Sequence, residues 1–242
     1  MPPETIAIVV ARGGSRRLPN KALLPFAGST MIGHKVRTLL SCQRIDRVVV
    51  GSDSQAILAE ASSAGAEVVV RDTAHCDESR CSANEMIRDM AGLVKSEDAN
   101  AWAVWAHPTN PLVKPETYDA AIEKYGSVGL HHDSLCSVTA EHRHAWFAGS
   151  PLNFDPKAAV HQCAADLHPV LHQNGAIFIQ SLARFRETAY FYGRNPVLFA
   201  IDAVEAWDID TREEYELARM IHRLQSAEPY AASLGQEVAA CR

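Results

Sequence analysis

The sequence predicts an α/β layered fold, as one domain or one domain with a lobe, and two observations support that prediction. Short β-branched runs alternate with stretches of helical period along most of the chain, as in sheets whose strands are joined by crossover helices. Hydrophobic residues make up 47% of the 242 residues, which is enough to bury one sizeable core. The alternation stops between residues 141 and 173, where His and Pro are frequent and no period persists. A loop region of this length in a compact domain is usually functional or contacts a partner.

Seven strands are expected, each a short apolar run between polar or turn-forming residues. In chain order they are Thr5–Ala11, Arg47–Ser52, Glu67–Val70, Ala101–Ala106, Leu135–Thr139, Gly175–Gln180 and Val197–Ile201.

Five helices are expected from apolar residues at helical spacing. In chain order they are Thr30–Leu40, Ser54–Ala64, Ala83–Val94, Pro115–Tyr125 and Arg212–Leu224. The last helix has the clearest start signal, because Thr211 and Glu214 form the pattern of a capping box. Asp53 is the candidate cap of the second helix.

The charge balance argues against nucleic acid and membranes as partners. The chain has 23 Lys and Arg against 29 Asp and Glu, a formal net charge of −6, so no global positive field attracts a polyanionic partner. The apolar stretch Ile6–Ala11 is far too short to span a bilayer, and Glu4 stands where a signal peptide would carry positive charge. We therefore expect a cytoplasmic protein with no membrane contact.

The cysteines are scattered and contain no C-x-x-C pair, so we expect reduced thiols and neither a zinc site nor a disulfide framework. They are Cys42, Cys76, Cys81, Cys136, Cys163 and Cys241.

A glycine-containing basic loop, ARGGSRRLPNK at residues 11–21, follows the first strand directly. Gly13 and Gly14 let the backbone approach an anion closely, and successive loop N–H groups can form an anion-binding concavity. Guanidinium and ammonium groups supply the countercharge. The cations of the loop are Arg12, Arg16, Arg17 and Lys21. The loop is neither a P-loop nor a Rossmann fingerprint, and a basic surface loop is the alternative interpretation.

A second motif, Trp207-Asp208-Ile209-Asp210-Thr211, lies between a strand and the capped helix. Residues two apart in an extended segment project to the same side, so Asp208 and Asp210 can converge on one cation. Mg²⁺ typically takes one or two carboxylates and completes its shell with water and substrate phosphates. The alternative is two surface aspartates near a helix N-terminus.

A third motif, HPTNPL at residues 107–112, follows the strand that ends at Ala106. Its prolines leave polar side chains at the carboxyl end of the strand, where ligands of open α/β sheets usually bind. The alternative is a turn before the helix that begins at Pro115.

A fourth motif, QNGAIFI, begins at Gln173. The amide of Asn174 and the glycine could hydrogen-bond a polyhydroxy substrate, or they could simply open the strand.

Together and in this order, the four motifs resemble those of the cytidylyltransferases that activate nonulosonic acids such as N-acylneuraminate, legionaminate and pseudaminate. The family's A-R-G-G-S-x-R-x-P-x-K is matched at Ala11, Arg12, Gly13, Gly14, Ser15, Arg17, Pro19 and Lys21. Its Q-P-T-S-P-L, E-N-G-A-I-Y-I and D-I-D-T are echoed at residues 107–112, 173–179 and 208–211. The resemblance extends from about Ile6 to Leu217.

The resemblance implies a three-layer Rossmann-like nucleotidyltransferase fold with a mostly parallel mixed sheet. It implies one domain over residues 1–242, with a small dimerisation and acceptor lobe near residues 141–195. The implied reaction converts CTP and a 2-keto sugar acid to a CMP-sugar and pyrophosphate, with Mg²⁺ as cofactor. A homodimer is implied as well, in which Phe191 and Tyr192 could reach the neighbouring subunit's site.

Carried over residue by residue, the family motifs imply three sets of site residues. For CTP they are Arg12, Gly13, Ser15, Lys21, Arg71, Ser82 and Thr109; for Mg²⁺ they are Asp208 and Asp210; for the acceptor they are Asn174 and Phe178. Lys21 would stabilise charge near the α-phosphate, and Arg12 would stabilise the departing pyrophosphate. Metal coordination could lower the pKa of the attacking hydroxyl, and Asp210 is a rival general base.

The chain departs from the family pattern mainly on the acceptor side. Ala22 stands where the family commonly has Asn, and His107 where it has Gln. The R-Q-x-L-P segment, which brings an arginine to the sugar carboxylate, aligns with residues 164–168, and the arginine is missing. Basic residues that could bind a carboxylate or phosphonate instead are His131, His132, His142, Arg143, His144, His161, His168 and His172.

Two other functions stay open at this point. The missing arginine is compatible with a phosphonate acceptor, because phosphonate cytidylyltransferases are similar in the nucleotide half. A nucleotide-binding protein without turnover is the other alternative, although Lys21 and the Asp208/Asp210 pair argue against it.

Overall fold

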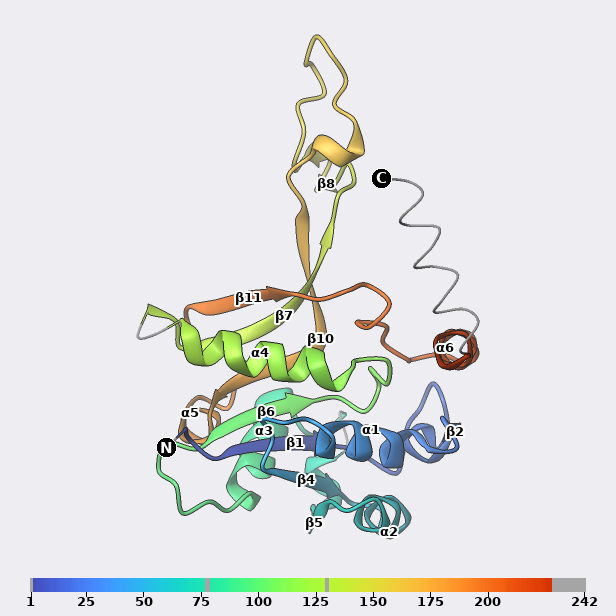
Figure 1. The fold of residues 1–242 in the computed structure, drawn as a ribbon, viewed down its shortest axis with the longest axis vertical. Helices are drawn as coiled ribbons and strands as arrows, with labels where there is room; N and C mark the ends of the chain where they lie inside the picture. The colour runs from blue at the N-terminus through green and yellow to red at the C-terminus, as the bar shows by residue number, and fades with distance from the viewer. Residues whose placement is uncertain (1, 77–78, 129–130, 228–242) are drawn as a thin grey trace.

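The computed structural model describes residues 2–76, 79–128 and 131–227, and its centre is a seven-stranded mixed sheet (Figure 1). The strand order is β11-β7-β10-β6-β1-β4-β5. The strands are β1 (Thr5–Val10), β4 (Arg47–Ser52), β5 (Glu67–Val70), β6 (Trp102–Ala106), β7 (Ser134–Glu141), β10 (Val170–Ser181) and β11 (Pro196–Ala200). Only β10 runs antiparallel to its neighbours, β6 and β7. The expected mostly parallel mixed sheet is confirmed.

Helices cover both faces of this sheet and make the fold three-layered. They are α1 (Met31–Leu40), α2 (Gln55–Ser63), α3 (Ala83–Leu93), α4 (Pro115–Ser127), α5 (Leu182–Thr188) and α6 (Arg212–Ser226). One buried cluster packs α1, α2 and α4 against Ala7 and Val9 of β1, and the other packs α3 and α5 against Ile6 and Ile8. The run Ile6–Val9 is fully buried because both faces of β1 are covered.

Short elements connect β1 to α1 and lie beside α6. They are η1 (Lys21–Leu23), β2 (Pro25–Phe26) and β3 (Ser29–Thr30), and a further 3-10 turn, η2 (Thr73–His75), follows β5. The α6 side of the molecule has its own cluster, in which Tyr215 packs near Phe26 and Met31. The Tyr215 hydroxyl donates to Pro25 O at 2.5 Å, so α6 is attached to the segment that follows Lys21.

The predicted capping box of α6 is confirmed, whereas the predicted cap of α2 is wrong. Thr211 accepts from the Glu214 N–H, and the Glu214 carboxylate accepts from the Thr211 N–H. The cap of α2 is Ser54, which accepts from Ile57 N. Asp53 lies one residue earlier and accepts instead from the Gly13 N–H at 2.9 Å.

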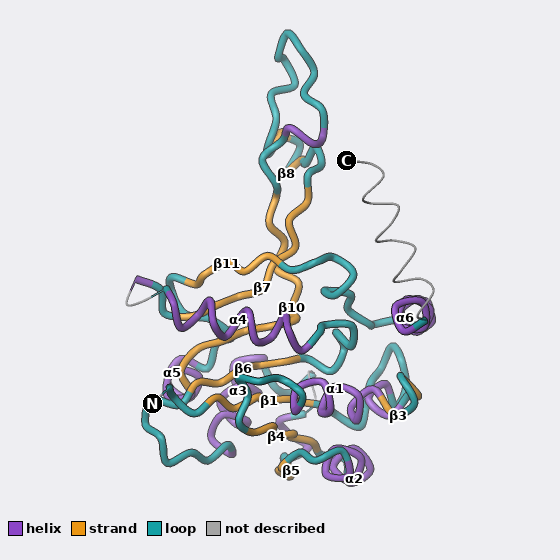
Figure 2. Tube along the Cα trace, viewed as in Figure 1, coloured by secondary structure: helices purple, strands orange, loops and turns teal. Residues whose placement is uncertain are grey.

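Between β7 and β10 the chain forms an arm, residues 142–169, that projects away from the sheet (Figure 1). Its base is the β7–β10 ladder, which is longer at both strands than the expected Leu135–Thr139 and Gly175–Gln180. The rest of the arm is mostly loop (Figure 2), with the hairpin β8 (Trp146–Phe147) and β9 (Ser150–Pro151) and the 3-10 turn η4 (Ala164–Asp166). The strands are longer than expected because the backbone pairing of β7 and β10 continues beyond their apolar residues. This pairing has no periodic pattern in the local sequence.

Helix α5 was not expected from the sequence. It has seven residues, begins at the Ser181 cap and buries only Leu182 and Phe185, which pack in the α3 cluster. Two apolar positions in one short helix are too few to show a period. Residues 182–195 therefore lie on the body of the protein, and the expected dimerisation lobe at 141–195 stays a prediction.

Two absences concern the described residues only. No helix among them is both long and apolar enough to cross a bilayer. The five cysteines in the described ranges are all free thiols, whereas Cys241 lies outside those ranges.

Candidate functional site

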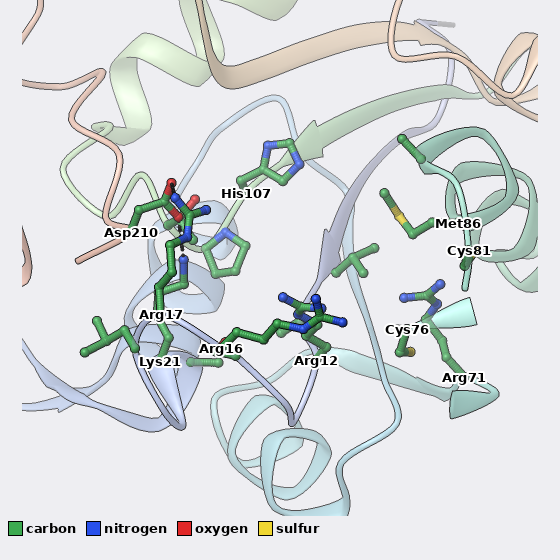
Figure 3. Close-up of a pocket in the computed structure, with 18 of the residues that line it drawn as sticks. Arg12, Arg16, Arg17, Lys21, Arg71, Cys76, Cys81, Met86, His107 and Asp210 are labelled. Carbon is green, nitrogen blue, oxygen red and sulfur yellow. Dashed lines mark hydrogen bonds and ion pairs between the residues drawn. The ribbon is translucent and has the colours of Figure 1, made fainter. Parts of the chain in front are cut away.

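A cleft of about 590 Å³ lies at the carboxyl ends of β1 and β6 (Figure 3). Carboxyl ends of parallel strands are the usual ligand position in open α/β sheets. The predicted residues that line the cleft are Arg12, Ser15, Lys21, Arg71, Ser82, Thr109 and Asp210. Of the residues carried over from the family, the cleft therefore collects most of the CTP set and one of the two aspartates.

The basic loop and the carboxylate motif meet directly in this cleft. The Lys21 Nζ lies 3.1 Å from Asp210 Oδ1 and donates to Ile209 O at 2.7 Å. The Arg17 guanidinium lies 2.8 Å from Asp210 Oδ2. The contact between Lys21 and Asp210 joins residues 189 positions apart in the sequence, and Figure 3 shows Arg17 and Lys21 both directed at Asp210. The basic loop and the aspartate motif, which the family resemblance assigns to one site, therefore face each other in the structure.

The two glycines of the loop have different environments. A Cβ at Gly13 would lie 3.2 Å from the Ser54 Cβ, so this position favours glycine for close packing against the start of α2. A Cβ at Gly14 would meet nothing within 4 Å. The Gly13 N–H already donates to Asp53 and Gly13 does not line the cleft, so its predicted contact with the triphosphate has no support here. Gly13 instead fixes the path of the loop.

Asp210 is held in place through its backbone. Its N–H donates to Glu214 Oε2 at 2.7 Å, within the capping arrangement of α6. These backbone donors lower the pKa of Glu214, which keeps that carboxylate ionised. On the other side, Ile209 N donates to Thr109 O at 2.9 Å. The HPTNPL turn and the Asp208–Asp210 segment are thereby joined into one wall of the cleft.

Asp208 lies outside the cleft lining, and its side chain is exposed. It is near enough to His107 to raise that residue's pKa, although burial is the larger effect and the net pKa of His107 is lowered. Within the described ranges, no three or more His, Cys, Asp or Glu side chains gather as a metal site. Two carboxylates two residues apart form a hard oxygen donor set, which suits Mg²⁺ when substrate phosphates complete its shell.

Arg71 and Cys81 lie at the end of the cleft opposite Lys21 (Figure 3), and Ser82, the next residue after Cys81, also lines the cleft. Arg71 is 2% exposed, and its guanidinium contacts Asp89 Oδ2 at 2.9 Å and His75 O at 2.8 Å. Ser82 is the cap of α3 and exchanges hydrogen bonds with Glu85. The side chains of Arg71 and Ser82 are therefore both held by hydrogen bonds within the protein.

His107 lines the cleft at the position where the family pattern has glutamine. Its Nδ1 lies 2.7 Å from Gly175 O, a contact in which the ring nitrogen donates. Burial lowers the pKa of His107, so the neutral ring keeps Nε2 as a hydrogen-bond acceptor.

The two residues predicted to contact the acceptor substrate, Asn174 and Phe178, both make contacts within the protein. Asn174 accepts from the Ser137 hydroxyl at 2.6 Å and donates to Thr139 Oγ1 at 3.1 Å, which secures the irregular part of the β7–β10 ladder. Phe178 is 1% exposed and stacks on Phe191 with ring centroids 4.7 Å apart. Neither lines the cleft, so contact with an acceptor has no support in this arrangement.

The segment that lacks the family arginine, residues 164–168, lies on the arm. Two histidines of the arm have structural contacts: His142 lies 3.0 Å from Leu167 O, and His144 stacks on His161 at 4.7 Å. Phe191 and Tyr192, expected at a neighbouring subunit's site, pack on Phe178 of the same chain.

Sequence reasoning missed two residues that shape the cleft. Arg17 was placed in the motif but given no role, although it pairs with Asp210. Asp89 holds Arg71 from α3, eighteen positions away, and nothing in the local sequence connects the two.

Comparison with known proteins agrees with this geometry. The family model described as cytidylyltransferase matches residues 6–231. The chain is 26% identical to an N-acylneuraminate cytidylyltransferase of Escherichia coli, a match that covers 91% of this chain and 52% of the relative. It is 24% identical to a pseudaminic acid cytidylyltransferase of Campylobacter jejuni, covering 91% of this chain and 97% of the relative. This chain thus spans about half of the first relative and nearly all of the second.

Among solved structures, the fold is similar to that of a CMP:2-keto-3-deoxy-manno-octonic acid synthetase complexed with CTP. The TM-score is 0.65 at 15% identity, and the match covers 92% of this chain and 99% of the other. At this identity the similarity shows the nucleotidyltransferase fold, and the residues of the cleft must carry any argument about chemistry.

Proposed function

The chain belongs to the cytidylyltransferase family, and on this premise we propose that it activates a nonulosonic acid. In the proposed reaction, CTP and the sugar acid give a CMP-sugar and pyrophosphate. The relatives named for N-acylneuraminate and pseudaminic acid support this acceptor class over the phosphonate alternative.

One observation carries the proposal: Lys21 and Arg17 meet Asp210 at the mouth of a cleft large enough for a nucleotide. A site for nucleotidyl transfer needs cations for the triphosphate beside carboxylates for a metal ion. Without a metal ion, the Asp210 carboxylate would repel the phosphates, so its position among these cations supports a metal-assisted reaction.

The proposed chemistry is an attack by the anomeric hydroxyl of the acceptor on the α-phosphorus of CTP. The new bond joins that oxygen to phosphorus, and the bond to the β-phosphate bridging oxygen breaks, so pyrophosphate leaves with the electron pair. Lys21 is placed to stabilise the charge that develops on the α-phosphate, and Arg12 to bind the departing pyrophosphate. Binding CTP would draw Lys21 and Arg17 from Asp210 toward phosphate oxygens.

Asp208 and Asp210 are the residues that would hold Mg²⁺. Their carboxylates fit a hard cation, and the two exposed or half-exposed side chains leave room for substrate phosphates as further ligands. When bound, the ion would supply Lewis-acid stabilisation of the phosphate charge and lower the pKa of the attacking hydroxyl. Asp210 would orient or accept the hydroxyl proton as the attack proceeds.

The nucleoside would occupy the end of the cleft lined by Arg71 and Ser82, because this end lies away from Asp210, where the phosphates would bind. Thr109 lines the cleft between the two ends and belongs to the wall that carries Asp210.

We further propose a homodimer formed through the arm. Four large apolar side chains of the arm are strongly exposed: Trp146 60%, Phe147 73%, Leu152 55% and Val160 79%. Exposed apolar residues gathered on one projecting segment usually mark a protein interface. The arm projects away from the sheet (Figure 1), and none of its residues lines the cleft of its own chain, so its residues would contribute to acceptor binding in a neighbouring subunit. The free thiols support a reducing compartment such as the cytoplasm.

The decisive experiment measures pyrophosphate release with CTP, Mg²⁺ and a panel of acceptors. N-acetylneuraminate, pseudaminate and a legionaminate form one arm of the panel, and aminoethylphosphonate forms the other. We expect turnover with at least one nonulosonate, and mass spectrometry should identify the CMP-sugar. Turnover with the phosphonate alone, or CTP binding without turnover on any acceptor, would overturn the proposal.

A further inference from the structure

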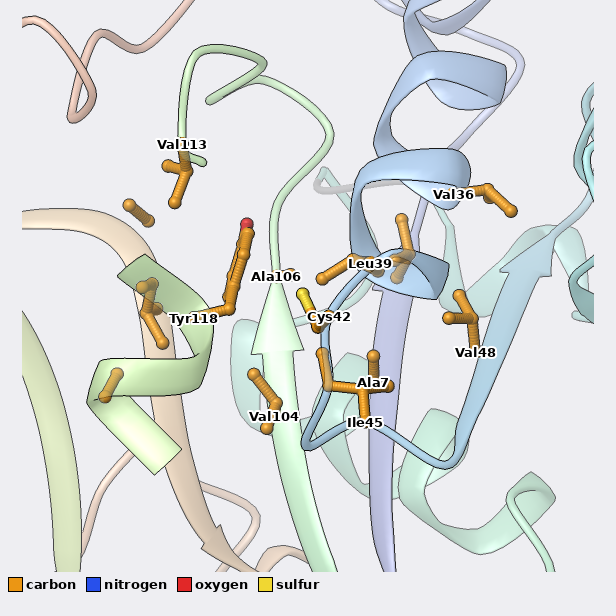
Figure 4. Close-up of a cluster of buried hydrophobic side chains, with 14 of the residues drawn as sticks. Ala7, Val36, Leu39, Cys42, Ile45, Val48, Val104, Ala106, Val113 and Tyr118 are labelled. Carbon is orange, nitrogen blue, oxygen red and sulfur yellow. The ribbon is translucent and has the colours of Figure 1, made fainter. Parts of the chain in front are cut away.

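Lys35 is a fully buried lysine in the centre of α1, and the cleft chemistry described above does not use it. Its side chain is 0% exposed. Its Nζ donates to Asn110 O and contacts the Tyr118 hydroxyl, each at 2.7 Å. No carboxylate pairs with it among the residues that the structure describes. The Tyr118 side chain that meets it extends from α4 beside β6 (Figure 4).

A lysine in such a place lowers stability, because burial without a carboxylate disfavours the charged amine. Burial lowers the pKa of Lys35 to about 7, while the nearby Cys42 thiol acts weakly in the opposite direction. The other titratable groups that it influences are His34 on the same helix, Tyr118 on α4 and His107 after β6. An apolar side chain would fill this space at lower cost, so the amine must be retained for what its hydrogen bonds do.

The hydrogen bonds of Lys35 lead to the cleft through Asn110. This residue is 1% exposed, and its backbone oxygen accepts from Lys35 while its side-chain amide donates to Ala206 O at 3.0 Å. One position earlier, Thr109 O accepts from Ile209 N at 2.9 Å. The Lys35 amine thus anchors the turn at residues 107–112, and this turn contacts the Ala206–Asp210 segment at Ala206 and at Ile209. Lys21 donates to Ile209 O of the same segment.

From this connection we propose that Lys35 is a positioning residue for the cytidylyl transfer. Its buried amine fixes the turn at residues 107–112 against α1, and through Asn110 it sets where Asp208 and Asp210 lie relative to Lys21. The kinetic consequences of this inference rest on the proposed function. The expected effect of Lys35 on CTP binding does not depend on any acceptor.

Two substitutions separate the two hydrogen bonds of the amine. Lys35→Met keeps the length of the side chain and removes both bonds, whereas Tyr118→Phe removes only the bond that does not lead to the cleft. We expect Lys35→Met to fold with an unchanged or higher melting temperature. Its kcat should fall about 10- to 100-fold, the size expected for a displacement of about 1 Å, with KM for CTP raised less than kcat is lowered. Tyr118→Phe should keep kcat within about twofold, as expected for a neutral change away from reacting groups.

Calorimetry with CTP keeps the test independent of the acceptor. Without any acceptor, Lys35→Met should weaken CTP binding in Mg²⁺ by more than Tyr118→Phe does. If wild type binds CTP but transfers to no acceptor, the proposed function fails, and this difference in affinity still decides the role of Lys35. Should Lys35→Met not fold, Asn110→Ala removes the bond to Ala206 and should lower kcat comparably. Wild-type kinetics and CTP affinity in both Lys35→Met and Asn110→Ala would overturn the proposal, as would equal losses in Lys35→Met and Tyr118→Phe.

Discussion

The cleft and the arm are built in opposite ways. In the cleft, the groups are held by partners within the same chain: Arg71 by Asp89, Asp210 by Glu214 through the backbone, and the wall itself by Asn110. The arm is mostly loop, and Phe147 at its β8–β9 hairpin is 73% exposed. This difference supports the two proposals above, a preorganised nucleotide site within one chain and an arm that contacts a second molecule.

The largest effect is expected at the cationic centre of the cleft. Lys21→Ala should lower kcat by about 100- to 1,000-fold, because a preorganised charge near the α-phosphate is lost. Pyrophosphate release at saturating CTP measures it. Lys95→Ala, which removes an exposed lysine away from the cleft, is the matched control and should leave kcat unchanged. A tenfold change in rate corresponds to about 1.4 kcal/mol in the activation free energy. If kcat of Lys21→Ala falls by less than about tenfold, Lys21 does not stabilise the transition state.

Asp210 tests whether the carboxylate acts through a metal ion. Asp210→Asn should lower kcat by about 100-fold and raise the Mg²⁺ concentration needed for activity. Without Mg²⁺, the same variant should bind CTP as well as wild type or better, since one negative charge beside the triphosphate is gone. Activity assays and calorimetry with and without Mg²⁺ measure the two effects. Glu213→Gln, three positions away at the start of α6, is the control, and equal Mg²⁺ dependence in both variants would contradict the assignment.

A substitution in the arm should change the oligomeric state and leave the fold of the rest of the protein unchanged. Trp146→Glu should raise the dimer dissociation constant by at least about tenfold, because a buried aromatic residue commonly contributes more than 1 kcal/mol to an interface. Analytical ultracentrifugation measures the constant. Met220→Glu introduces the same charge at a side chain of similar exposure on α6, 57% against 60%, and should leave assembly unchanged. A wild-type monomer at all concentrations would refute the proposed role of the arm.

The last expected effect is on the pH dependence of stability. The pKa of Lys35 is lowered from 10.5 to about 7 in the folded protein, so the unfolded chain binds more protons between those pH values. Stability therefore rises with pH across that window by at most about 1.4 kcal/mol per pH unit from this group. Denaturant unfolding from pH 7 to 10 should show this rise in wild type and in Lys124→Met, an exposed lysine on α4. The rise should be absent in Lys35→Met; parallel curves for all three proteins would contradict the burial of a titrating amine.

Much of the fold could be predicted because its information is local. Every expected strand and helix is present, since each is a short apolar run or an amphipathic period with its own boundaries. The failures have specific causes. Asp53 resembles a cap in sequence, but the residue that adopts the extended cap geometry is Ser54, one position later. Helix α5 carries too few apolar residues for a period, and the β7–β10 ladder continues where only the partner strand explains it.

The residues of the candidate site likewise fall into those that a local motif predicts and those whose position depends on packing. The basic loop and the aspartate motif are contiguous, so their residues could be named before their positions were known. The positions of the predicted acceptor residues could not be inferred from the motif alone. Asn174 and Phe178 match the family pattern, but Asn174 hydrogen-bonds within the protein and Phe178 is buried. A motif states which side chains are available, whereas packing decides which of them still face a ligand.

By itself, then, the amino-acid sequence determined the layered fold, the family and the two contiguous motifs that we propose bind a nucleotide, because these follow from local periods and short motifs. The tertiary structure alone decided that Lys21 meets Asp210 across 189 positions, that Asp89 holds Arg71, and that a buried Lys35 supports the wall between them. The physical reason is that hydrogen bonds and ion pairs act over about 3 Å in space whatever the separation along the chain.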